Sequence, residues 1–388
     1  MSRQLLSGHK VEQASEEEVT SMEIVPFVRG MVRILPEGWL YPGSAPIYLD
    51  KIYNMKFRSD DVMVMTFPKC GTTWMQEIVW TMLHNPNLDN PKGNEAIWFR
   101  SQDISLDMHM DAEAMGGKLW NPIMEKFEKM CPGGRVEDGV SLQILEATAG
   151  PRVIKCHYPF SLLPPEMLQS AKVVYVTRNP KDMMVSFYWF WKDCSIFEYR
   201  GNFENCVRQL MNGTTLFTPY WPHVKEAWQK RHDSNVKFVY YEDLKADIML
   251  ELRKLNEFLG TRLCEEKLEA VAQHTSFSSM KRKGDNHEKD FFGETKFNKN
   301  ETKASFYRKG KEGREGKVNE KTKRIQSEGK EEEQGEEEEG GLYSRSLSSN
   351  QAQETYPTQG LSASLKTHRL LLLRLLINLH PSWLSAEG

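Results

Sequence analysis

The sequence predicts an α/β protein whose central sheet is mostly parallel and flanked by helices. Three observations predict this class. Short apolar runs rich in β-branched residues have the composition of buried strands. Helical patterns follow several of these runs, and buried strands that alternate with helices build a mostly parallel sheet. After Gly313 the composition changes sharply, which indicates that one folded domain ends there and a tail begins.

The predicted strands are residues 62–67 (VMVMTF), 152–156 (RVIKC), 172–177 (KVVYVT) and 236–241 (VKFVYY). Helices are predicted at 73–83 and 250–259, where apolar residues recur with helical spacing, and Gly260 stands where a C-cap is expected. Ligands on parallel sheets bind at the carboxyl ends of the strands. The residues that follow these strands are therefore the first candidates for a site.

The chain divides by composition into three parts. Residues 1–21 are polar and are expected to form a mobile N-terminal arm, whereas residues 22–313 have the apolar clusters of a single domain. Residues 314–388 begin with a charge-dense run and continue rich in Ser, Gln and Thr, with one leucine cluster at 370–379 that suits a short helix. Such a segment buries too little apolar surface to offset its ordering entropy, so we expect a disordered tail.

Charge and cysteine content limit the possible partners. The formal net charge is -3, which gives no general case for binding nucleic acid or an anionic membrane. The six cysteines are scattered, without C-x-x-C pairs or zinc spacing, as expected in a reducing compartment. We find no signal-peptide pattern and no apolar run of about 18 residues that would span a bilayer. The predicted location is the cytoplasm.

The strand 62–67 leads directly into Pro68-Lys69-Cys70-Gly71-Thr72-Thr73-Trp74 and then a predicted helix. Free amides at a helix N-terminus and the helix dipole attract phosphate, and Lys69 adds a positive charge. The loop differs from the NTPase type because Lys69 precedes the glycine. An ordinary strand–turn–helix connection is the alternative interpretation.

A second candidate anion site follows the strand 172–177. Arg178 stands at the strand end, and Ser186 follows eight residues later in a predicted helix. A guanidinium and a hydroxyl at this spacing suit one further phosphate group. The alternatives are a surface salt bridge between Arg178 and Asp182 and an ordinary helical serine at 186.

His157 follows the strand 152–156, two residues after Lys155, so both side chains are expected on the same side of the chain. An imidazole suits proton removal near neutral pH. Lys155 and Lys69 would supply positive charge to a leaving phosphate. A structural histidine that caps a loop is the alternative for His157.

Six stretches together resemble the cytosolic sulfotransferase family and occur in the family's order: TFPKCGTTW, RVIKCHYPF, VVYVTRNPKDMMVSFYWF, VKFVYYEDLKAD, HTSFSSMK and FYRKG. The resemblance covers residues 38–313. It implies a single domain related to the nucleotide kinases, with a P-loop-like donor site. It also implies transfer of the sulfuryl group of 3′-phosphoadenylyl sulfate (PAPS) to a hydroxyl or amine of a small, apolar or aromatic acceptor, without a metal.

The resemblance also assigns roles to individual residues. His157, Lys69 and Lys155 would be catalytic, and the donor's 5′-phosphosulfate would lie on Lys69, Cys70, Gly71, Thr72, Thr73 and Trp74. Arg178 and Ser186 would bind its 3′-phosphate. The remaining donor contacts would come from Tyr241, Thr275, Ser276, Phe277, Ser278, Ser279, Met280, Arg308, Lys309 and Gly310. Cys70 departs from the family, in which serine is commoner.

The family pattern breaks near residue 313. Arg314-Glu315-Gly316 stands where the family has Asp-Trp-Lys, and the family's dimerisation segment is not found, so homodimer formation stays open. A kinase is disfavoured because the GK[ST] loop and magnesium carboxylates are not found. Two alternatives to an active sulfotransferase stay open: a PAP-binding homologue impaired by its altered C-terminus, and an alcohol dehydratase of the same family.

Overall fold

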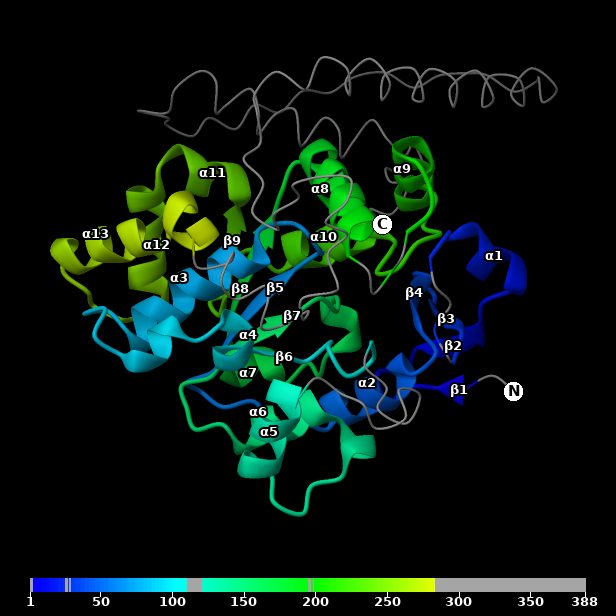
Figure 1. Ribbon diagram of the computed structural model, residues 1–388, viewed down its shortest axis with the longest axis horizontal. Coiled ribbons are helices and arrows are strands. Elements are labelled where there is room, and N and C mark those ends of the chain that lie inside the picture. Colours follow the sequence, from blue (N-terminus) through cyan, green and yellow to red (C-terminus); the bar gives the residue numbers. More distant parts are fainter. Residues whose placement is uncertain are drawn as a thin grey trace, which may run out of the picture. The chain divides into compact units, whose positions relative to one another are not determined.

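The computed structural model describes residues 3–282, apart from 25, 26, 28, 110–120, 195, 196 and 198 (Figure 1). The predicted tail at 314–388, the domain boundary at 313 and the donor contacts Arg308, Lys309 and Gly310 lie outside the described residues. None of the helices within the described part is long and apolar enough to cross a membrane.

The central sheet has five parallel strands in the order β6-β7-β5-β8-β9, as Figure 1 shows. They are β5 (Val62–Thr66), β6 (Gln102–Asp103), β7 (Val153–Cys156), β8 (Lys172–Thr177) and β9 (Val236–Tyr240). Every residue of the central strand β5 is buried, because it has neighbours on both edges and helices on both faces. The predicted parallel sheet is confirmed, and each predicted strand agrees with the observed one to within a residue at either end.

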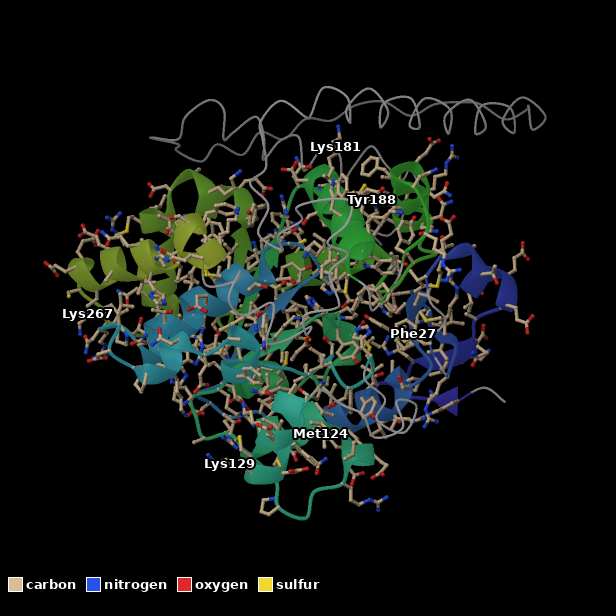
Figure 2. The ribbon with its side chains drawn as sticks, viewed as in Figure 1. Phe27, Met124, Lys129, Lys181, Tyr188 and Lys267 are labelled. Carbon is tan, nitrogen blue, oxygen red and sulfur yellow. The ribbon has the colours of Figure 1, made fainter. Side chains whose placement is uncertain are left out.

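The helices that follow the strands are confirmed as well. α3 (Thr72–His84) follows β5, and α12 (Ile248–Leu259) ends at Gly260, which has the left-handed φ of 74° that favours glycine in a C-cap. α8 (Pro180–Asp193) follows β8, and Asn179 caps it by accepting a hydrogen bond from the amide of Lys181. Tyr188 of α8 packs edge-on against Phe203, with ring centroids 5.4 Å apart (Figure 2).

The remaining helices surround this framework. The α-helices are α2 (Ala45–Tyr53), α4 (Ile97–Arg100), α5 (Asn121–Met130), α6 (Val140–Ala147), α7 (Met167–Ser170), α9 (Phe203–Met211), α10 (Tyr220–Gln229), α11 (Tyr241–Ala246) and α13 (Glu265–His274). The short 3-10 helices are η1 (Pro91–Asn94), η2 (Val136–Asp138) and η3 (Phe160–Leu162).

Alternate residues of the strands supply two separate apolar cores. Val64 and Val174 pack with α3, α12 and α13 on one face of the sheet. Met65 and Tyr175 pack with α2, α8 and α10 on the other face. Because successive strand residues point to opposite faces, a continuous apolar run buries both sides of the sheet. This two-sided covering leaves the carboxyl ends of the strands as the natural place for a ligand.

The N-terminal segment corrects one prediction. Residues 3–21, expected to be a mobile arm, form β1 (Arg3–Gln4), β2 (Lys10–Gln13) and α1 (Glu16–Ser21). β1 and β2 join β3 (Met31–Leu35) and β4 (Trp39–Pro42) in an antiparallel sheet of order β1-β2-β3-β4. Leu5, Val11 and Ala14 are buried there. The polar residues that indicated an arm are the exposed side chains of β1, β2 and α1, and only these few apolar residues of the segment are buried.

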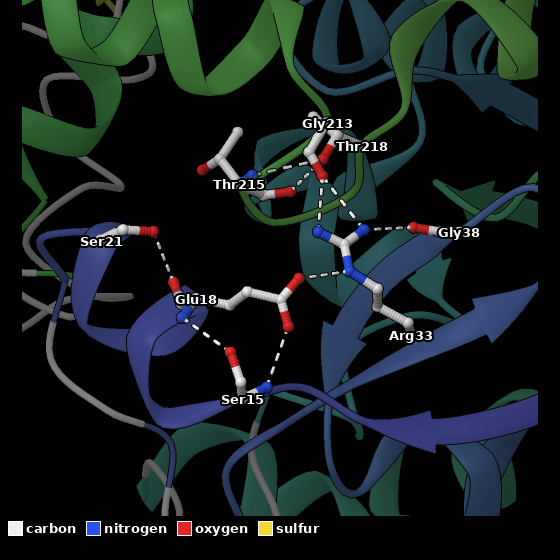
Figure 3. Close-up of polar contacts among 8 residues, drawn as sticks. All are labelled: Ser15, Glu18, Ser21, Arg33, Gly38, Gly213, Thr215 and Thr218. Carbon is white, nitrogen blue, oxygen red and sulfur yellow. Dashed lines mark hydrogen bonds and ion pairs between the residues drawn. The ribbon is translucent and has the colours of Figure 1, made fainter.

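Arg33 of β3 ties this sheet to a distant loop, as Figure 3 shows. Its Nε donates to Glu18 Oε1 at 2.6 Å, and its Nη1 donates to the carbonyls of Gly38 at 3.0 Å and Gly213 at 3.3 Å. Glu18 itself closes a capping box with Ser15 at the start of α1. The guanidinium therefore holds α1 and the 213–218 loop to the sheet.

Candidate active site

The phosphate loop has the geometry that its sequence predicts. Lys69 and Gly71 both have left-handed backbones, with φ of 69° and 105°, and Gly71 is the N-cap of α3. This turn presents the first amides of α3 and the helix dipole at the end of β5. A Cβ on Gly71 would lie 2.7 Å from Cδ2 of Tyr241, so only glycine fits there.

The departure at Cys70 does not alter this loop. The Cys70 side chain is fully buried in the core, and burial raises the pKa of its thiol to about 12. The Cys70 amide donates to the carbonyl of Phe67 at 3.3 Å, so position 70 stabilises the turn through its backbone.

Arg178 and Tyr241 come together beside the loop. The Arg178 Nη1 donates to the carbonyl of Lys69 at 3.2 Å, and its Cζ lies 4.5 Å from the centre of the Tyr241 ring. Tyr241, the first residue of α11, contacts Trp74 edge-on with ring centroids 5.6 Å apart. Loop, guanidinium and aromatic rings therefore form one surface at the ends of β5, β8 and β9.

Two polar atoms on this surface are ready for a ligand. Arg178 Nε and Trp74 Nε1 are buried, and neither has a hydrogen-bond partner among the described residues. Buried donors in folded proteins are nearly always paired, so two that are not mark a place for an acceptor. With the loop amides, they fit an anionic nucleotide.

His157 follows β7 and is 8% exposed. Its Nδ1 lies 2.9 Å from the backbone carbonyl of Thr66, at the end of β5. A carbonyl only accepts, so Nδ1 carries the proton and Nε2 keeps its lone pair. Burial, with a smaller effect of the nearby Lys155 ammonium, lowers the pKa of His157 to about 3. The imidazole is therefore neutral at physiological pH, with Nε2 available as a base.

Thr66 connects this imidazole to the phosphate loop. Its Oγ1 lies 2.6 Å from Oγ1 of Thr72 and 3.3 Å from the His157 Nδ1. One threonine side chain thus contacts both the His157 imidazole and the phosphate loop. His223 adds a further support, because its Nε2 lies 3.2 Å from the His157 carbonyl while its Nδ1 lies 2.7 Å from the Tyr175 hydroxyl.

Lys155 lies beside His157 but in an ion pair. Its Nζ is 2.8 Å from Oδ2 of Asp103, the last residue of β6. Burial raises the pKa of Asp103, but the charge of Lys155 and hydrogen bonds from Lys155 and Ser105 outweigh this effect, so the pKa falls to about 2. The carboxylate is therefore ionised and keeps the ammonium at the end of the sheet.

Comparison with known proteins identifies the class. Residues 59–323, more than half of the chain, match the family model described as the sulfotransferase domain. The chain belongs to the sulfotransferase family. It is a PAPS-dependent sulfotransferase, an enzyme that transfers a sulfuryl group.

Curated relatives and solved structures agree with this assignment. Sulfotransferase 1A1 of Mus musculus is 35% identical over 234 residues, covering 60% of this chain and 71% of the relative. Sulfotransferase 4A1 of Homo sapiens is 32% identical over 227 residues, covering 58% and 69%. The crystal structure of retinol dehydratase with retinol and PAP is 27% identical, covers 82% of this chain and 95% of its own, and superimposes with a TM-score of 0.67.

Ser186 and residues 275–280 are the other residues of this sulfotransferase that the sequence predicts to bind the donor. Ser186 lies half-buried in α8, and no contact among the described residues joins its hydroxyl to Arg178. Thr275 is buried just after α13, whose last residue His274 lies 3.2 Å from Glu77 of α3. The segment 275–280 therefore stands next to α3, with Phe277 exposed and Met280 buried.

Sequence reasoning missed three members of the site. Thr66 and Asp103 contact the predicted histidine and lysine, and Phe217 packs edge-on against His157, with centroids 5.6 Å apart. Thr66 had a usable signal, since it ends a buried strand just before the loop. Asp103 and Phe217 had none, because their strand and loop carry no local pattern. Among the described residues, no group of three His, Cys, Asp or Glu side chains is arranged to hold a metal ion.

Proposed function

We propose that this sulfotransferase transfers the sulfuryl group of PAPS to a hydroxyl or amine of a small apolar or aromatic acceptor, with His157 as general base. One observation carries the proposal. The Nδ1 of His157 is bound to the Thr66 carbonyl, which leaves Nε2 unprotonated beside the phosphate loop. Neutral imidazole is the form that removes a proton.

The reaction is an in-line displacement at sulfur. The acceptor oxygen forms a bond to sulfur, its proton passes to Nε2 of His157, and the bond from sulfur to the 5′-phosphate oxygen breaks. The electrons of that bond remain on PAP. Lys69 and Lys155 would stabilise this charge, since Lys155 lies close enough to both Lys69 and His157 for their charges to interact.

The surface around the phosphate loop supports the donor assignment. The residues Lys69–Trp74 would hold the 5′-phosphosulfate, Arg178 and Ser186 the 3′-phosphate, and Tyr241 with 275–280 the adenosine. The free donors Arg178 Nε and Trp74 Nε1 fit such a polyanion. No metal ion is needed for this arrangement of charge.

The acceptor class rests on the aromatic side chains beside His157. Phe217 packs against His157, and Tyr41 packs edge-on against Phe217, so these surroundings suit an apolar or aromatic acceptor. The retinol dehydratase structures, one with retinol and one with androsterone at 26% identity and a TM-score of 0.66, are consistent with this. They also favour a second candidate, a dehydratase that sulfonates an alcohol and then eliminates sulfate and a proton to leave an alkene.

We also propose the cytoplasm as the place of action and a small molecule as the partner, without nucleic acid or membrane. The scattered cysteines and the modest charge of the chain support this. Homodimer formation and the effect of the altered C-terminus on activity remain predictions from the sequence.

The test is a product assay with sulfur-labelled PAPS and a panel of phenols, alcohols and amines. A labelled ester supports the sulfotransferase, and free labelled sulfate with an alkene product supports the dehydratase. Binding of PAP without product indicates the impaired homologue.

We expect His157→Ala to lower turnover by about 10²–10⁴-fold while PAP affinity changes little, because the base acts only in the chemical step. His232→Ala, a change at an exposed histidine, is the matched control and is expected to be active. Near-normal turnover of His157→Ala would return His157 to a structural role.

A further inference from the structure

A second imidazole packs against the aromatic ring that contacts the proposed base. Phe217 lies 5.6 Å from the ring of His157 and 5.2 Å from the ring of His109. His109 also contacts Phe27 at 6.1 Å and Phe197 at 6.4 Å (Phe27 is labelled in Figure 2). The His109 imidazole is thus surrounded by three phenyl rings, and one of them, Phe217, also contacts His157.

One nitrogen of His109 is unpaired within the part of the chain that the structure describes. Its Nδ1 is buried and has no hydrogen-bond partner among the described residues. Leaving such a buried atom unpaired destabilises the protein, so a ligand group that pairs with it gains affinity. Burial lowers the pKa of His109 to about 4, and the imidazole is therefore neutral at physiological pH, with one N–H and one lone pair.

The backbone that carries His109 is fixed from several elements. Ser44, before α2, donates from Oγ to the Met108 carbonyl at 2.6 Å, and the Tyr158 hydroxyl donates to the Met108 sulfur at 3.0 Å. Next to them, Asp107 accepts from the first amides of α6 at 2.9 and 3.0 Å. Tyr158 directly follows His157, so the same short segment positions both imidazoles.

Phe217, between them, is held just as firmly. Its amide donates to the Leu40 carbonyl at 2.9 Å, and the Leu40 amide donates to the Thr218 carbonyl at 2.8 Å. Its φ is 72°, a strained value for phenylalanine. Such strain persists where the surroundings over-determine it and concentrates at functional sites. The backbone therefore holds the Phe217 ring in a fixed position, in contact with both His157 and His109.

We propose that His109 determines acceptor specificity by hydrogen-bonding a second hydroxyl of the acceptor, at the end opposite the hydroxyl that His157 deprotonates. The preferred acceptor is thus a rigid apolar ring skeleton with a hydroxyl at each end. A hydroxyl both donates and accepts, so it pairs with His109 in either tautomer. The inference rests on the proposed function, because it takes His157 as the reacting end.

The test compares acceptors that differ by one hydroxyl, on two skeleton lengths. The pairs are 4-phenylphenol with 4,4′-dihydroxybiphenyl, and 2-naphthol with 2,6-dihydroxynaphthalene. In the unmodified protein, we expect kcat/KM for at least one dihydroxy compound to exceed that of its monohydroxy partner by at least about 10-fold. A second reacting hydroxyl by itself would account for a factor of only about two. His109→Phe keeps an aromatic ring and removes both nitrogens, so the ratio is expected to fall to about two. His109→Gln restores a hydrogen-bonding group and part of the ratio.

Each ratio is measured within one variant, so it does not depend on how much of that variant folds. The same pairs are also measured by thermal shift with PAP bound, which requires no turnover. If no acceptor yields an ester, the proposed function fails, and the thermal shifts still decide the role of His109. The inference is overturned if the unmodified protein and His109→Phe show the same preference for the dihydroxy over the monohydroxy compound, in rate or in thermal shift.

Discussion

Lys69 holds an ammonium group where charge is disfavoured. Burial, together with the positive charges of Lys155 and Arg178, lowers its pKa to about 7. Because the folded-state pKa lies below the ordinary value, Lys69 destabilises the fold progressively as pH falls from about 10.5 to about 7. A bound polyanion reverses this by favouring the charged form.

We therefore expect proton uptake when PAP binds at pH 8. Lys69 is mostly neutral in the free protein at that pH, and the phosphates of PAP are already ionised, since their second pKa is about 6. Calorimetry in buffers of different ionisation enthalpy measures the uptake. Lys69→Met is expected to abolish it, and Lys10→Met, an exposed control, to preserve it. Heats at pH 8 that do not depend on the buffer would contradict the role of Lys69.

At the scale of elements, the turn from β5 into α3 depends on close approach to α11. Gly71 combines a left-handed backbone with the contact to Tyr241. Gly133 has a similar φ of 79°, yet no atom lies within 4 Å of the position its Cβ would take. The two glycines separate the effect of backbone strain from the effect of steric contact.

Gly71→Ala is expected to weaken PAP binding by at least about 10-fold. The loop must move away from Tyr241, and its amides then no longer point at the phosphate group. Gly133→Ala is the control, and both alanine variants carry about 1–2 kcal/mol of strain from the left-handed backbone. Only Gly71→Ala should affect PAP affinity, measured by calorimetry, and it should also give the lower melting temperature. Equal PAP affinities in the two variants would show that the contact has no functional role.

Across the whole molecule, the N-terminal sheet supports the acceptor side of the site. Arg33 holds the loop that contains Phe217, and β4 binds the same loop through Leu40. The proposed donor surface lies at the ends of β5, β8 and β9, in the central sheet. Damage to the N-terminal sheet should therefore affect the two substrates differently.

Removal of residues 2–21 is expected to lower the melting temperature and raise acceptor KM, while PAP affinity changes much less. The deletion exposes the partners of Leu5 and Val11, each worth about 1.5–3 kcal/mol when buried, and removes the Glu18 contact of Arg33. Arg33→Gln should show a smaller change of the same kind, and Lys10→Ala almost none. An unaltered melting temperature and KM after the deletion would support the mobile arm that the sequence predicts.

The sequence by itself determined four of the five strands of the central sheet and most of the proposed site residues. Strands 62–67 and 172–177, the loop after Lys69, and His157 were predicted because each depends on a local pattern: a buried run, a turn residue, a strand end. The parallel sheet then brings strand ends together without further information.

The tertiary structure alone decided which groups touch. Thr66 binds His157 across 91 residues of chain, and Asp103, Phe217 and His109 reach the site from segments without a periodic pattern. The N-terminal sheet was missed for the same reason, since one buried residue such as Val11 in a polar strand is not a pattern. Contacts between segments far apart in the chain depend on how surfaces pack in three dimensions, and packing leaves no periodicity in the sequence.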